Sequence, residues 1–252
     1  MITPERASAI AHGDLRFYNP LSESSVGALL DLVRLSDEDR VLDVGCGRGE
    51  LLIRIAERTG AGGLGVDASE EQIAIAREEA EARAPGGHLA FESRDARAMV
   101  APAGGFALAA CIGSTHALGG LAPTIDRLTE LVRPGGYLVI GEGYWHKEPS
   151  REVLRLLGAT AGELTPLPGL LAAGDPHGLS LVHLAIASDQ DWRRYEWTYI
   201  FNLDRYLHEH PHEEGLGELR SRLERVRSRR LLAARDGEAL DYALDAWRKS
   251  SR

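Results

Sequence analysis

The sequence predicts an α/β domain in which helices flank a doubly wound parallel sheet. From about Arg40 onward, short apolar runs alternate with longer segments of helical periodicity, which is typical of strands joined by crossover helices. The first run leads into the glycine-rich stretch "VLDVGCGRGE" at Val41–Glu50, as expected for a strand-to-helix turn. At 252 residues, the chain is long enough for one such domain with additions.

Seven strands are expected from the apolar runs and from the turn residues that bound them. They are Val41–Val44, Gly65–Asp67, His88–Ser93, Phe106–Ile112, Tyr137–Glu142, Leu179–Ala187 and Tyr242–Arg248. The "RPGG" of Arg133–Gly136 should end a helix and turn the chain toward the fifth strand, because proline cannot continue the helical hydrogen bonding and glycine accepts a positive φ.

Helices are expected where apolar residues recur at helical spacing. They are Ser22–Leu35, Leu51–Arg58, Glu70–Ala84, Pro123–Val132, Pro149–Leu157, Gln190–His210 and Gly217–Arg235. Ser69 and Gln72 form the pattern of a capping box, which satisfies free N–H groups at a helix start. The first helix should bury one face, made of Val26, Leu29, Leu30 and Val33.

These elements suggest a single domain over residues 1–252, with three parts. Residues 1–38 form a helical N-terminal head or lid, in which "RFYNP" is a loop, and residues 39–142 form the core. Residues 143–252 supply helices that cover the substrate, a proline- and glycine-rich loop at Gly162–Gly178, and the last two strands.

Composition limits the possible partners. The formal net charge of −9 disfavours general electrostatic binding to nucleic acid or to an anionic membrane. Two cysteines cannot make a disulfide framework, and the N-terminal stretch lacks the apolar core of a signal peptide. No apolar run reaches the roughly 20 residues needed to span a bilayer. We therefore expect a cytoplasmic protein that acts on a small or neutral partner.

The glycine-rich turn differs from a phosphate-binding loop in one respect, which is the carboxylate at its mouth. A dinucleotide fold uses G-x-G-x-x-G and a P-loop adds a lysine, whereas this turn reads Gly45-x-Gly47-x-Gly49 behind Asp43. An ionised Asp43 would repel a diphosphate in a partly desolvated site. The ligand should instead carry a positive charge and no phosphate, and any carboxylate on it could use free amides of the loop.

The stretch from Asp43 to Gly49 resembles the first motif of the class I S-adenosylmethionine-dependent methyltransferases, E/D-x-G-x-G-x-G. The resemblance covers residues from about Arg40 to Glu142. It implies a Rossmann-like sheet and S-adenosylmethionine as the cofactor, which carries an α-ammonium and a sulfonium. An ordinary tight turn and a dinucleotide loop remain the alternatives for this motif.

Two further acidic residues fit the resemblance. Asp67 ends the second strand, where a carboxylate can accept both ribose hydroxyls, although the same logic suits NAD. Asp95 follows the third strand and resembles the family's acceptor for the adenine amino group, with a helix cap as its alternative. The cofactor residues that the resemblance implies are Tyr18, Asp43, Gly45, Cys46, Gly47, Gly49, Asp67, Ala68, Gln72, Asp95, Ala96, Cys111, Ile112 and Gly113.

Within that set, three assignments carry specific reasons. Cys111–Gly113, at the end of the fourth strand, should lie along the methionine arm at the crevice of the sheet. Gln72 is an adenine-side contact or only a capping residue. The N-terminal "H-G-D-x-R-x-x-N-P" resembles a bacterial methyltransferase subfamily, which makes His12, Arg16, Tyr18 and Asn19 a lid over the cofactor or an ordered N-terminal arm.

Catalytic candidates are polar groups that are expected near the carboxyl ends of strands four and five, because the ligand crevice of an open α/β sheet lies there. His116 is the first choice for a general base, with a solvent-exposed loop histidine as the alternative. Glu142 at the end of the fifth strand and Tyr144 just after it are expected as pocket wall and polar anchors. Glu196 lies on the stripe Trp192, Tyr195, Glu196, Tyr199 and Leu203, and either binds substrate or forms a surface pair with Arg193.

Other functions stay open at this point. The basic run Arg220–Arg230 would suit an RNA methyltransferase, but its interspersed apolar and acidic residues favour a solvated helix. An NAD-dependent oxidoreductase and a non-catalytic cofactor-binding scaffold are further rivals. The histidines of His208–His212 do not build a closed metal site, so no metal is expected. The sequence determines neither the acceptor atom (O, N, S or C) nor the oligomeric state.

Overall fold

The computed structural model describes residues 2–13, 15–237 and 239–251. The chain divides into two compact units. The sheet unit comprises Ser22–Glu142, Pro168–Ile186 and Ala243–Arg252, and the helical unit comprises Met1–Leu21, Gly143–Leu167 and Ala187–Tyr242. The division into head, core and cover that the sequence suggests stays a prediction.

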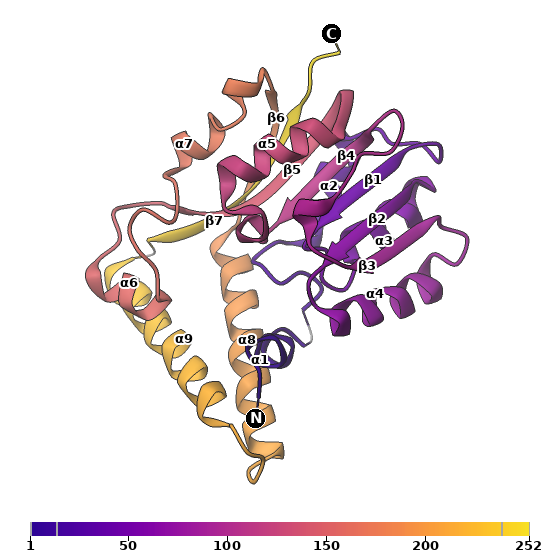
Figure 1. Ribbon diagram of the computed structural model, residues 1–252. Helices are drawn as coiled ribbons and strands as arrows, with labels where there is room; N and C mark the ends of the chain where they lie inside the picture. Colours follow the sequence, from indigo (N-terminus) through magenta and orange to yellow (C-terminus); the bar gives the residue numbers. More distant parts are fainter. Residues whose placement is uncertain (1, 14, 238, 252) are drawn as a thin grey trace. The chain divides into compact units, whose positions relative to one another are not determined.

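One seven-stranded sheet has the order β3-β2-β1-β4-β5-β7-β6 (Figure 1). Its strands are β1 (Arg40–Val44), β2 (Gly62–Asp67), β3 (Leu89–Ser93), β4 (Phe106–Ile112), β5 (Val132–Trp145), β6 (Ser180–Ile186) and β7 (Leu240–Arg248). The pairs from β3 through β5 are parallel, and β6 pairs antiparallel with β7. All seven expected strands are present, and the strand order reverses beside β1, where open α/β sheets bind their ligands.

All seven expected helices are present as well. The helices are α1 (Pro4–His12), α2 (Glu23–Leu32), α3 (Glu50–Thr59), α4 (Glu70–Arg83), α5 (Leu121–Leu131), α6 (Arg151–Leu157), α7 (Leu167–Leu171), α8 (Asp189–Glu209) and α9 (Gly217–Asp236). Short 3-10 turns are η1 (Ala96–Ala98), η2 (Thr115–Leu118) and η3 (Asp175–His177). In the described part of the chain, none of the helices is long and apolar enough to cross a membrane.

Two helices were not expected individually. The sequence predicted only a helical head where α1 begins behind its Thr3 cap. The predicted loop at 162–178 is wrong in part, because it contains α7 and η3. Helices α1 and α7 are short, so they have too few turns for helical periodicity to be recognised in the sequence.

The "RPGG" segment lies inside a strand rather than before it, which corrects the prediction. Helix α5 ends at Leu131, and Val132 already pairs with Phe106 of β4. The next pair joins Leu108 to Tyr137, so the residues between 132 and 137 bulge out of the ladder, with Gly135 at a φ of +75°. Proline cannot donate to a ladder and is tolerated at such a bulge.

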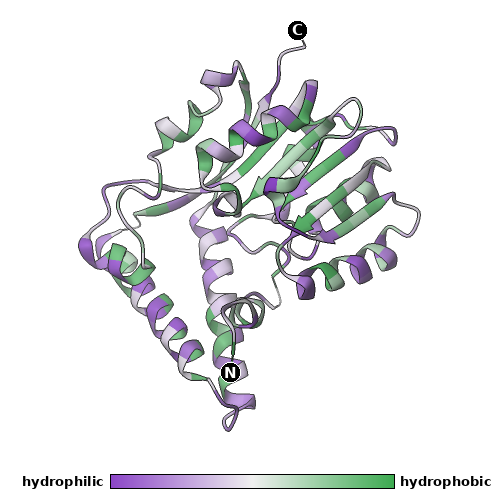
Figure 2. Ribbon diagram, in the orientation of Figure 1, coloured by the Kyte–Doolittle hydropathy of each residue, from purple (hydrophilic) through white to green (hydrophobic). Residues whose placement is uncertain are grey.

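Helices cover both faces of the sheet unit. On one face, Leu42, Ala109 and Ile140 from three strands form a core with Ile125 and Leu128 of α5. On the other face, a Cβ at Gly63 would lie 2.8 Å from a methyl group of Leu52, so glycine lets α3 pack close to β2. Figure 2 shows the resulting apolar strands between helices with one polar side. The doubly wound sheet is therefore confirmed.

The helical unit is built from α1, α8 and α9. Ala7 and Ala11 of α1 pack with Tyr199 and Leu203 of α8 and with Leu219 of α9. The amide of Asn202 donates to the Ala11 carbonyl over 3.1 Å, which fixes α1 along α8. The expected stripe on α8 is confirmed as an inward-facing surface, since Trp192, Glu196, Tyr199 and Leu203 are buried.

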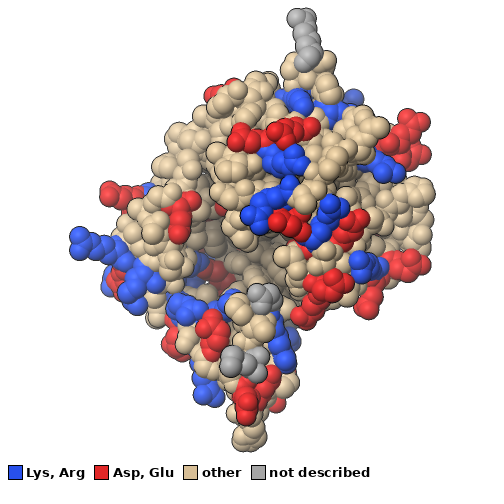
Figure 3. Space-filling view, viewed as in Figure 1, with Lys and Arg blue, Asp and Glu red and all other residues tan. Residues whose placement is uncertain are grey.

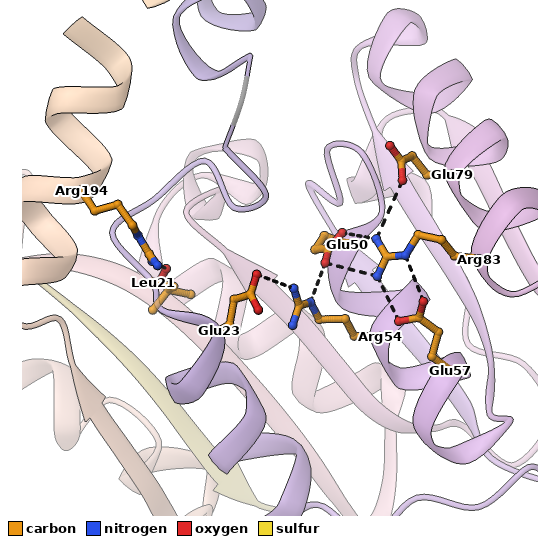
Figure 4. Close-up of polar contacts among 8 residues, drawn as sticks. All are labelled: Leu21, Glu23, Glu50, Arg54, Glu57, Glu79, Arg83 and Arg194. Atoms are coloured by element: carbon orange, nitrogen blue, oxygen red, sulfur yellow. Dashed lines mark hydrogen bonds and ion pairs between the residues drawn. The ribbon is translucent and has the colours of Figure 1, made fainter. Parts of the chain in front are cut away.

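A network of ion pairs in the sheet unit fastens the start of α3 (Figure 4). Glu50 is the first residue of α3 and only 4% exposed. Its carboxylate binds Arg54 Nε at 2.5 Å and Arg83 Nη1 of α4 at 2.6 Å. Arg54 also pairs with Glu23 at 3.1 Å, which joins α2 to the network. The network holds three helices around the residue that directly follows the glycine turn.

The first prediction concerns Glu50→Gln, which removes the buried charge and leaves Arg54 and Arg83 without their shared carboxylate. Breaking a buried pair costs about 3–5 kcal/mol, and partial exposure of both arginines reduces this to about 2 kcal/mol. Chemical denaturation should show this loss. Glu78→Gln, the same change at an exposed position of α4, is the control and should stay within about 0.5 kcal/mol of wild type.

Candidate functional site

The glycine turn between β1 and α3 requires its three glycines for different reasons. All three have a positive φ, of 71° at Gly45, 51° at Gly47 and 77° at Gly49. A Cβ at Gly45 would overlap the Ser114 side chain, and one at Gly49 would lie 2.6 Å from the Phe91 ring. A Cβ at Gly47 would meet nothing within 4 Å. Gly47 thus faces open space, which leaves room for a ligand against the backbone.

Four amides of this turn already have partners inside the protein. The N–H groups of Gly45 and Cys46 donate to the Val66 carbonyl at 2.8 and 3.0 Å. The Gly49 N–H donates to the Cys46 carbonyl at 2.9 Å, and the Gly47 N–H donates to the Asp67 carboxylate at 3.0 Å. These four amides are therefore not free for a ligand's carboxylate, which corrects that part of the expectation. For the same reason, these four amides do not contribute to an amide nest of the kind that binds phosphates.

Asp67 is held in place by backbone groups at the end of β2. One carboxylate oxygen accepts the Gly47 N–H at 3.0 Å, and the other accepts the Ser69 N–H at 2.9 Å. Each oxygen keeps further lone-pair capacity, because an ionised carboxylate can accept about four hydrogen bonds. The side chain is thus a fixed acceptor at the carboxyl end of the sheet.

Asp43 is unusual in this site because its carboxyl group is buried and has a raised pKa. It is 4% exposed, and no hydrogen bond or ion pair to its carboxylate occurs among the described residues. Burial, together with the nearby charge of Asp67, raises the pKa of Asp43 to about 8. A cation close to this pair would favour the ionised form, whereas an anion would raise the energy further.

Glu50 adds a third carboxylate at the end of the turn. Helix N-termini bind phosphate because their free N–H groups and dipole attract negative charge. Here Glu50 stands in the first turn of α3 and is neutralised by arginines that approach from α3 and α4. Asp43 and Asp67, rather than the paired Glu50, therefore make the region around the turn suitable for a positively charged ligand and unsuitable for a diphosphate.

The residues after β3 combine capping with a possible ligand role. Asp95 is exposed and caps η1, because its carboxylate accepts the Arg97 N–H at 2.9 Å. Hydrogen bonds from Arg97 also hold the pKa of Asp95 below its usual range. The cap named as the alternative for Asp95 is present, and an adenine contact stays a prediction. Ala96 behind it is buried.

The start of α4 also shows its capping contact. The Ser69 hydroxyl accepts the Gln72 N–H at 3.3 Å, which gives one half of the expected capping box. The Gln72 side chain is buried, and Ala68 just before Ser69 is exposed. Contacts of Gln72 and Ala68 with a nucleoside stay predictions.

At the end of β4, the main chain rather than the Cys111 thiol is available for contact with a ligand. Cys111 is fully buried in the core on the α5 face, and burial raises the pKa values of both the Cys111 and the Cys46 thiols. Ile112 is half-buried, and the next residue, Gly113, has a φ of +72°. The Gly113 N–H donates to the Gly141 carbonyl at 2.8 Å. Any contact of Cys111 with a ligand would therefore involve its main chain.

Comparisons with known proteins decide the family. A family profile described as "Methyltransferase domain" matches residues 41–136. The uncharacterized protein YjhP of Escherichia coli (strain K12) is 31% identical over 92% of this chain and 94% of its own length. A crystal structure described as a SAM-dependent methyltransferase from Geobacter sulfurreducens, in complex with S-adenosyl-L-homocysteine, is 32% identical, with a TM-score of 0.87 over 98% of this chain and 99% of that one. The chain belongs to the class I S-adenosylmethionine-dependent methyltransferases.

The methyltransferase uses S-adenosylmethionine as its methyl donor, and the described residues suit that cofactor. The open space at Gly47, the unpartnered Asp43 and the nearby charge of Asp67 fit a cationic nucleoside without phosphate. A further relative is the 27-O-demethylrifamycin SV methyltransferase of Amycolatopsis mediterranei (strain S699), which is 31% identical over 45% of this chain. The chain covers 42% of that protein's length, so this match concerns less than half of each protein.

Two catalytic candidates of the methyltransferase lie in the sheet unit. His116 is exposed on the 3-10 turn η2, directly after β4. Glu142 is half-buried on β5 and accepts a hydrogen bond from the Thr115 hydroxyl, also on η2. The structure thus joins η2 and β5 through Thr115, a residue that the sequence did not single out.

The candidates in the helical unit are occupied by structural contacts. The Tyr144 hydroxyl donates to Asp241 at 2.9 Å, and the Trp192 indole N–H donates to the other Asp241 oxygen at 2.9 Å. Glu196 is 2% exposed and pairs with Arg229 and with Arg230, the latter at 2.9 Å.

The alternative for Glu196, a surface pair with Arg193, is wrong. Arg193 pairs instead with Asp189 on its own helix, while Glu196 points into the unit toward α9. Helical spacing cannot decide between these two partners, because it does not say which residues of another helix lie opposite. A carboxylate held by two arginines is poorly suited to act as a general base.

The N-terminal residues His12 and Tyr18 belong to an aromatic cluster in the helical unit. The Tyr18 ring stacks on His12 with centroids 4.4 Å apart. His12 Nδ1 lies 2.9 Å from the Ser8 carbonyl, which can only accept, so Nδ1 carries the proton and Nε2 accepts from the Tyr195 hydroxyl at 3.0 Å. Burial lowers the pKa of His12 to about 4, so the ring stays neutral at physiological pH. The roles of lid and cofactor contact stay predictions.

The second prediction is that Asp43→Asn stabilises the ligand-free protein in a pH-dependent way. The folded-state pKa of Asp43 is raised to about 8 from 3.8, so between these pH values the folded protein keeps Asp43 protonated while the unfolded chain ionises it, and stability falls as pH rises. At pH 8 the variant should therefore be more stable by roughly 1–3 kcal/mol, because the buried asparagine amide offsets part of the gain of about 1.4 kcal/mol per pKa unit.

Thermal unfolding at pH 5 and pH 8 without cofactor tests this prediction. The stabilisation should shrink strongly at pH 5, where Asp43 is already protonated. Asp37→Asn, at an exposed carboxylate that precedes β1, is the control and should behave alike at both pH values. An equal gain at pH 5 and pH 8 would show that ionisation of Asp43 is not the cause.

Proposed function

We propose that this methyltransferase acts on a small-molecule acceptor and binds its cofactor along the carboxyl ends of β1, β2, β3 and β4. The observation that carries the cofactor placement is the glycine turn, in which amides are used internally and Asp43 is left uncompensated. An NAD-dependent oxidoreductase would need a turn without a buried carboxylate beside the diphosphate.

Each cofactor residue has a proposed role. Asp67, held by the Gly47 and Ser69 amides, accepts the ribose hydroxyls. Asp95 and the Ala96 amide contact the adenine, while Asp43 favours the cationic amino acid end through its charge. The backbone at Ile112 and Gly113 lines the methionine arm.

When bound, S-adenosylmethionine supplies an activated methyl group on a sulfonium. The chain's task is then to hold the acceptor atom close to and in line with that methyl group, which lowers the entropic part of the barrier. If the acceptor arrives protonated, His116 and Glu142 are the proposed groups that take its proton, because both belong to the carboxyl ends of β4 and β5. Tyr144 and Glu196 are proposed to support the architecture of the helical unit instead.

An oxygen acceptor is the first to test. The partial relative from Amycolatopsis mediterranei is named for methylating 27-O-demethylrifamycin SV, a small molecule. Because that match covers less than half of each protein, it supports the reaction class more than any particular acceptor. The expected cytoplasmic location is part of this proposal.

A nucleic-acid substrate is disfavoured by how the arginines of α9 are used. Arg229 and Arg230 pair with the buried Glu196, and Arg227 pairs with Asp204 of α8 at 2.9 Å. Figure 3 shows acidic side chains interspersed with basic ones over the face in view, rather than a continuous basic surface. Binding along a phosphate backbone requires several basic side chains that are free to contact it.

The third prediction is that Asp67→Ala weakens S-adenosylhomocysteine binding by roughly 10- to 100-fold, because two hydrogen bonds to a charged acceptor are lost. Isothermal titration calorimetry measures this change, and circular dichroism checks the fold. Asp67→Asn separates the two roles of the side chain, since its carbonyl can still anchor one amide. Asp37→Ala is the control, and wild-type affinity in Asp67→Ala would remove the ribose assignment.

The fourth prediction is that methyl-labelled S-adenosylmethionine, incubated with the protein and a bacterial metabolite extract, gives a labelled product below about 1 kDa in mass. Mass spectrometry identifies the product and the methylated atom. His116→Ala should then lower turnover by roughly 100-fold with little effect on cofactor affinity if His116 is the base. Tight cofactor binding without any labelled product would favour a non-catalytic scaffold, and label on RNA would favour the nucleic-acid rival.

A further inference from the structure

The side chain of Thr115 is buried beyond the carboxyl end of β4 and contacts one of the catalytic candidates. Thr115 is the first residue of the 3-10 turn η2 and is only 7% exposed. Its hydroxyl donates a hydrogen bond to Oε2 of Glu142 on β5, and both residues belong to the sheet unit. A hydroxyl that donates to a carboxylate favours the ionised form of that carboxylate and limits its rotation.

The main chain of Thr115 is anchored independently of its side chain. Its carbonyl accepts the Gly120 N–H at 2.9 Å and lies 3.2 Å from the hydroxyl of Thr124, which is fully buried on α5. Just before η2, the Gly113 N–H donates to the Gly141 carbonyl at 2.8 Å, which joins the end of β4 to β5. The hydroxyl donor is therefore attached to a fixed backbone.

Glu142 has the rotational freedom that such a donor restricts. The last torsion of a glutamate side chain has broad energy minima, so its carboxylate turns easily unless a partner holds it. Glu142 follows Ile140 by two residues on β5 and therefore projects from the same face, which carries the core with α5. It is half-buried, which leaves part of the side chain accessible to a ligand.

The neighbours of Glu142 differ from it in charge or in order. Burial, the charge of Asp43 and the charge of Glu142 raise the pKa of the Cys111 thiol on β4, so this thiol stays protonated. His116, directly after Thr115, is exposed, and no side-chain hydrogen bond orients its ring among the described residues. Of the two groups proposed to take a proton, Glu142 is thus the one that the fold orients.

We propose that Thr115 is a positioning residue for methyl transfer, which holds the Glu142 carboxylate in the orientation that takes the acceptor's proton. This inference rests on the proposed function, because it concerns the same site. A lone pair of the acceptor forms the bond to the methyl carbon while the carbon–sulfur bond breaks and leaves its electron pair on sulfur. The proton of the acceptor's O–H or N–H group passes to Glu142, which later releases it to water.

The same arrangement selects a class of acceptor. A carboxylate that is fixed in this way can accept a hydrogen bond from a hydroxyl or amino group before the methyl group is transferred. An acceptor that presents a carboxylate or phosphate at this position would be repelled by the like charge of Glu142. The methylated group should therefore be a hydroxyl or an amine.

Turnover of the full chain tests the role of Thr115. The probe is methyl-labelled S-adenosylmethionine with a bacterial metabolite extract at fixed concentration, and the label in small-molecule products is measured. Thr115→Val removes the hydroxyl and keeps the shape, so it should lower the apparent kcat by roughly 10- to 100-fold and leave the apparent KM for S-adenosylmethionine unchanged. Thr115→Ser retains the hydroxyl and should restore most of the turnover.

The matched control is Thr129→Val, the same change on the helix that follows η2. The Thr129 hydroxyl has no hydrogen-bond partner among the described residues, so this variant should turn over like wild type. Unchanged S-adenosylhomocysteine binding by calorimetry confirms that each variant is folded. If Thr115→Val does not fold, Thr115→Ala replaces it as the variant without a hydroxyl.

A double-mutant cycle shows whether Thr115 acts through Glu142. Glu142→Gln alone should lower kcat by roughly 100-fold. Adding Thr115→Val to Glu142→Gln should lower kcat by less than about twofold further, because the group that Thr115 positions is already lost. A second loss as large as that of Thr115→Val alone would show that the hydroxyl acts by another route, and the proposal would be wrong.

Crystal structures give a measurement that does not depend on turnover. The Glu142 carboxylate should take one orientation against Thr115 in the wild type, and in Thr115→Val it should turn away or take two orientations. A carboxylate that keeps its orientation in Thr115→Val would contradict the positioning role.

The outcomes separate this inference from the proposed function. A labelled product from wild type together with wild-type turnover in Thr115→Val would overturn the inference alone. A product labelled on a carboxylate or phosphate would overturn the class of acceptor. No labelled product from the wild type would remove the proposed function, and the inference with it.

Discussion

The two hydrogen bonds that the Asp67 carboxylate accepts from Gly47 and Ser69 are the contacts on which the cofactor region depends. They join the end of β2 to the turn after β1 and to the start of α4. Because the turn also donates to the Val66 carbonyl, its backbone is fixed at several points before any ligand binds. A site that is preorganised in this way spends little binding free energy on ordering the protein.

Three carboxylates beside this turn are in different electrostatic states. Glu50 is neutralised by arginines, Asp67 is held by backbone amides, and Asp43 is buried without a partner among the described residues. Only Asp43 therefore gains substantially when a cation arrives. Burying the Asp43 carboxylate destabilises the ligand-free protein, and proteins retain local destabilisation of this kind at functional sites.

The helical unit shows why polar residues amid aromatic ones can mislead. The catalytic interpretation of Glu196 and Tyr144 rested on their neighbours in the sequence, but their partners Arg229 and Asp241 come from distant segments. Buried polar groups in proteins are usually satisfied, so a carboxylate on an aromatic stripe implies a partner before it implies chemistry. The Arg-rich run supplies that partner, which the sequence presented as a separate feature.

The sequence by itself determined the seven strands, most helices, the glycine turn and the methyltransferase family, because these depend on short-range periodicity and on residues that tolerate special backbone angles. Only the tertiary structure decided which groups meet. It placed the "RPGG" segment in a bulge, paired Glu50 and Glu196 with arginines, used four of the turn's amides internally and joined Thr115 to Glu142. Burial and pairing depend on contacts between residues far apart in the chain, and one sequence does not reveal these contacts.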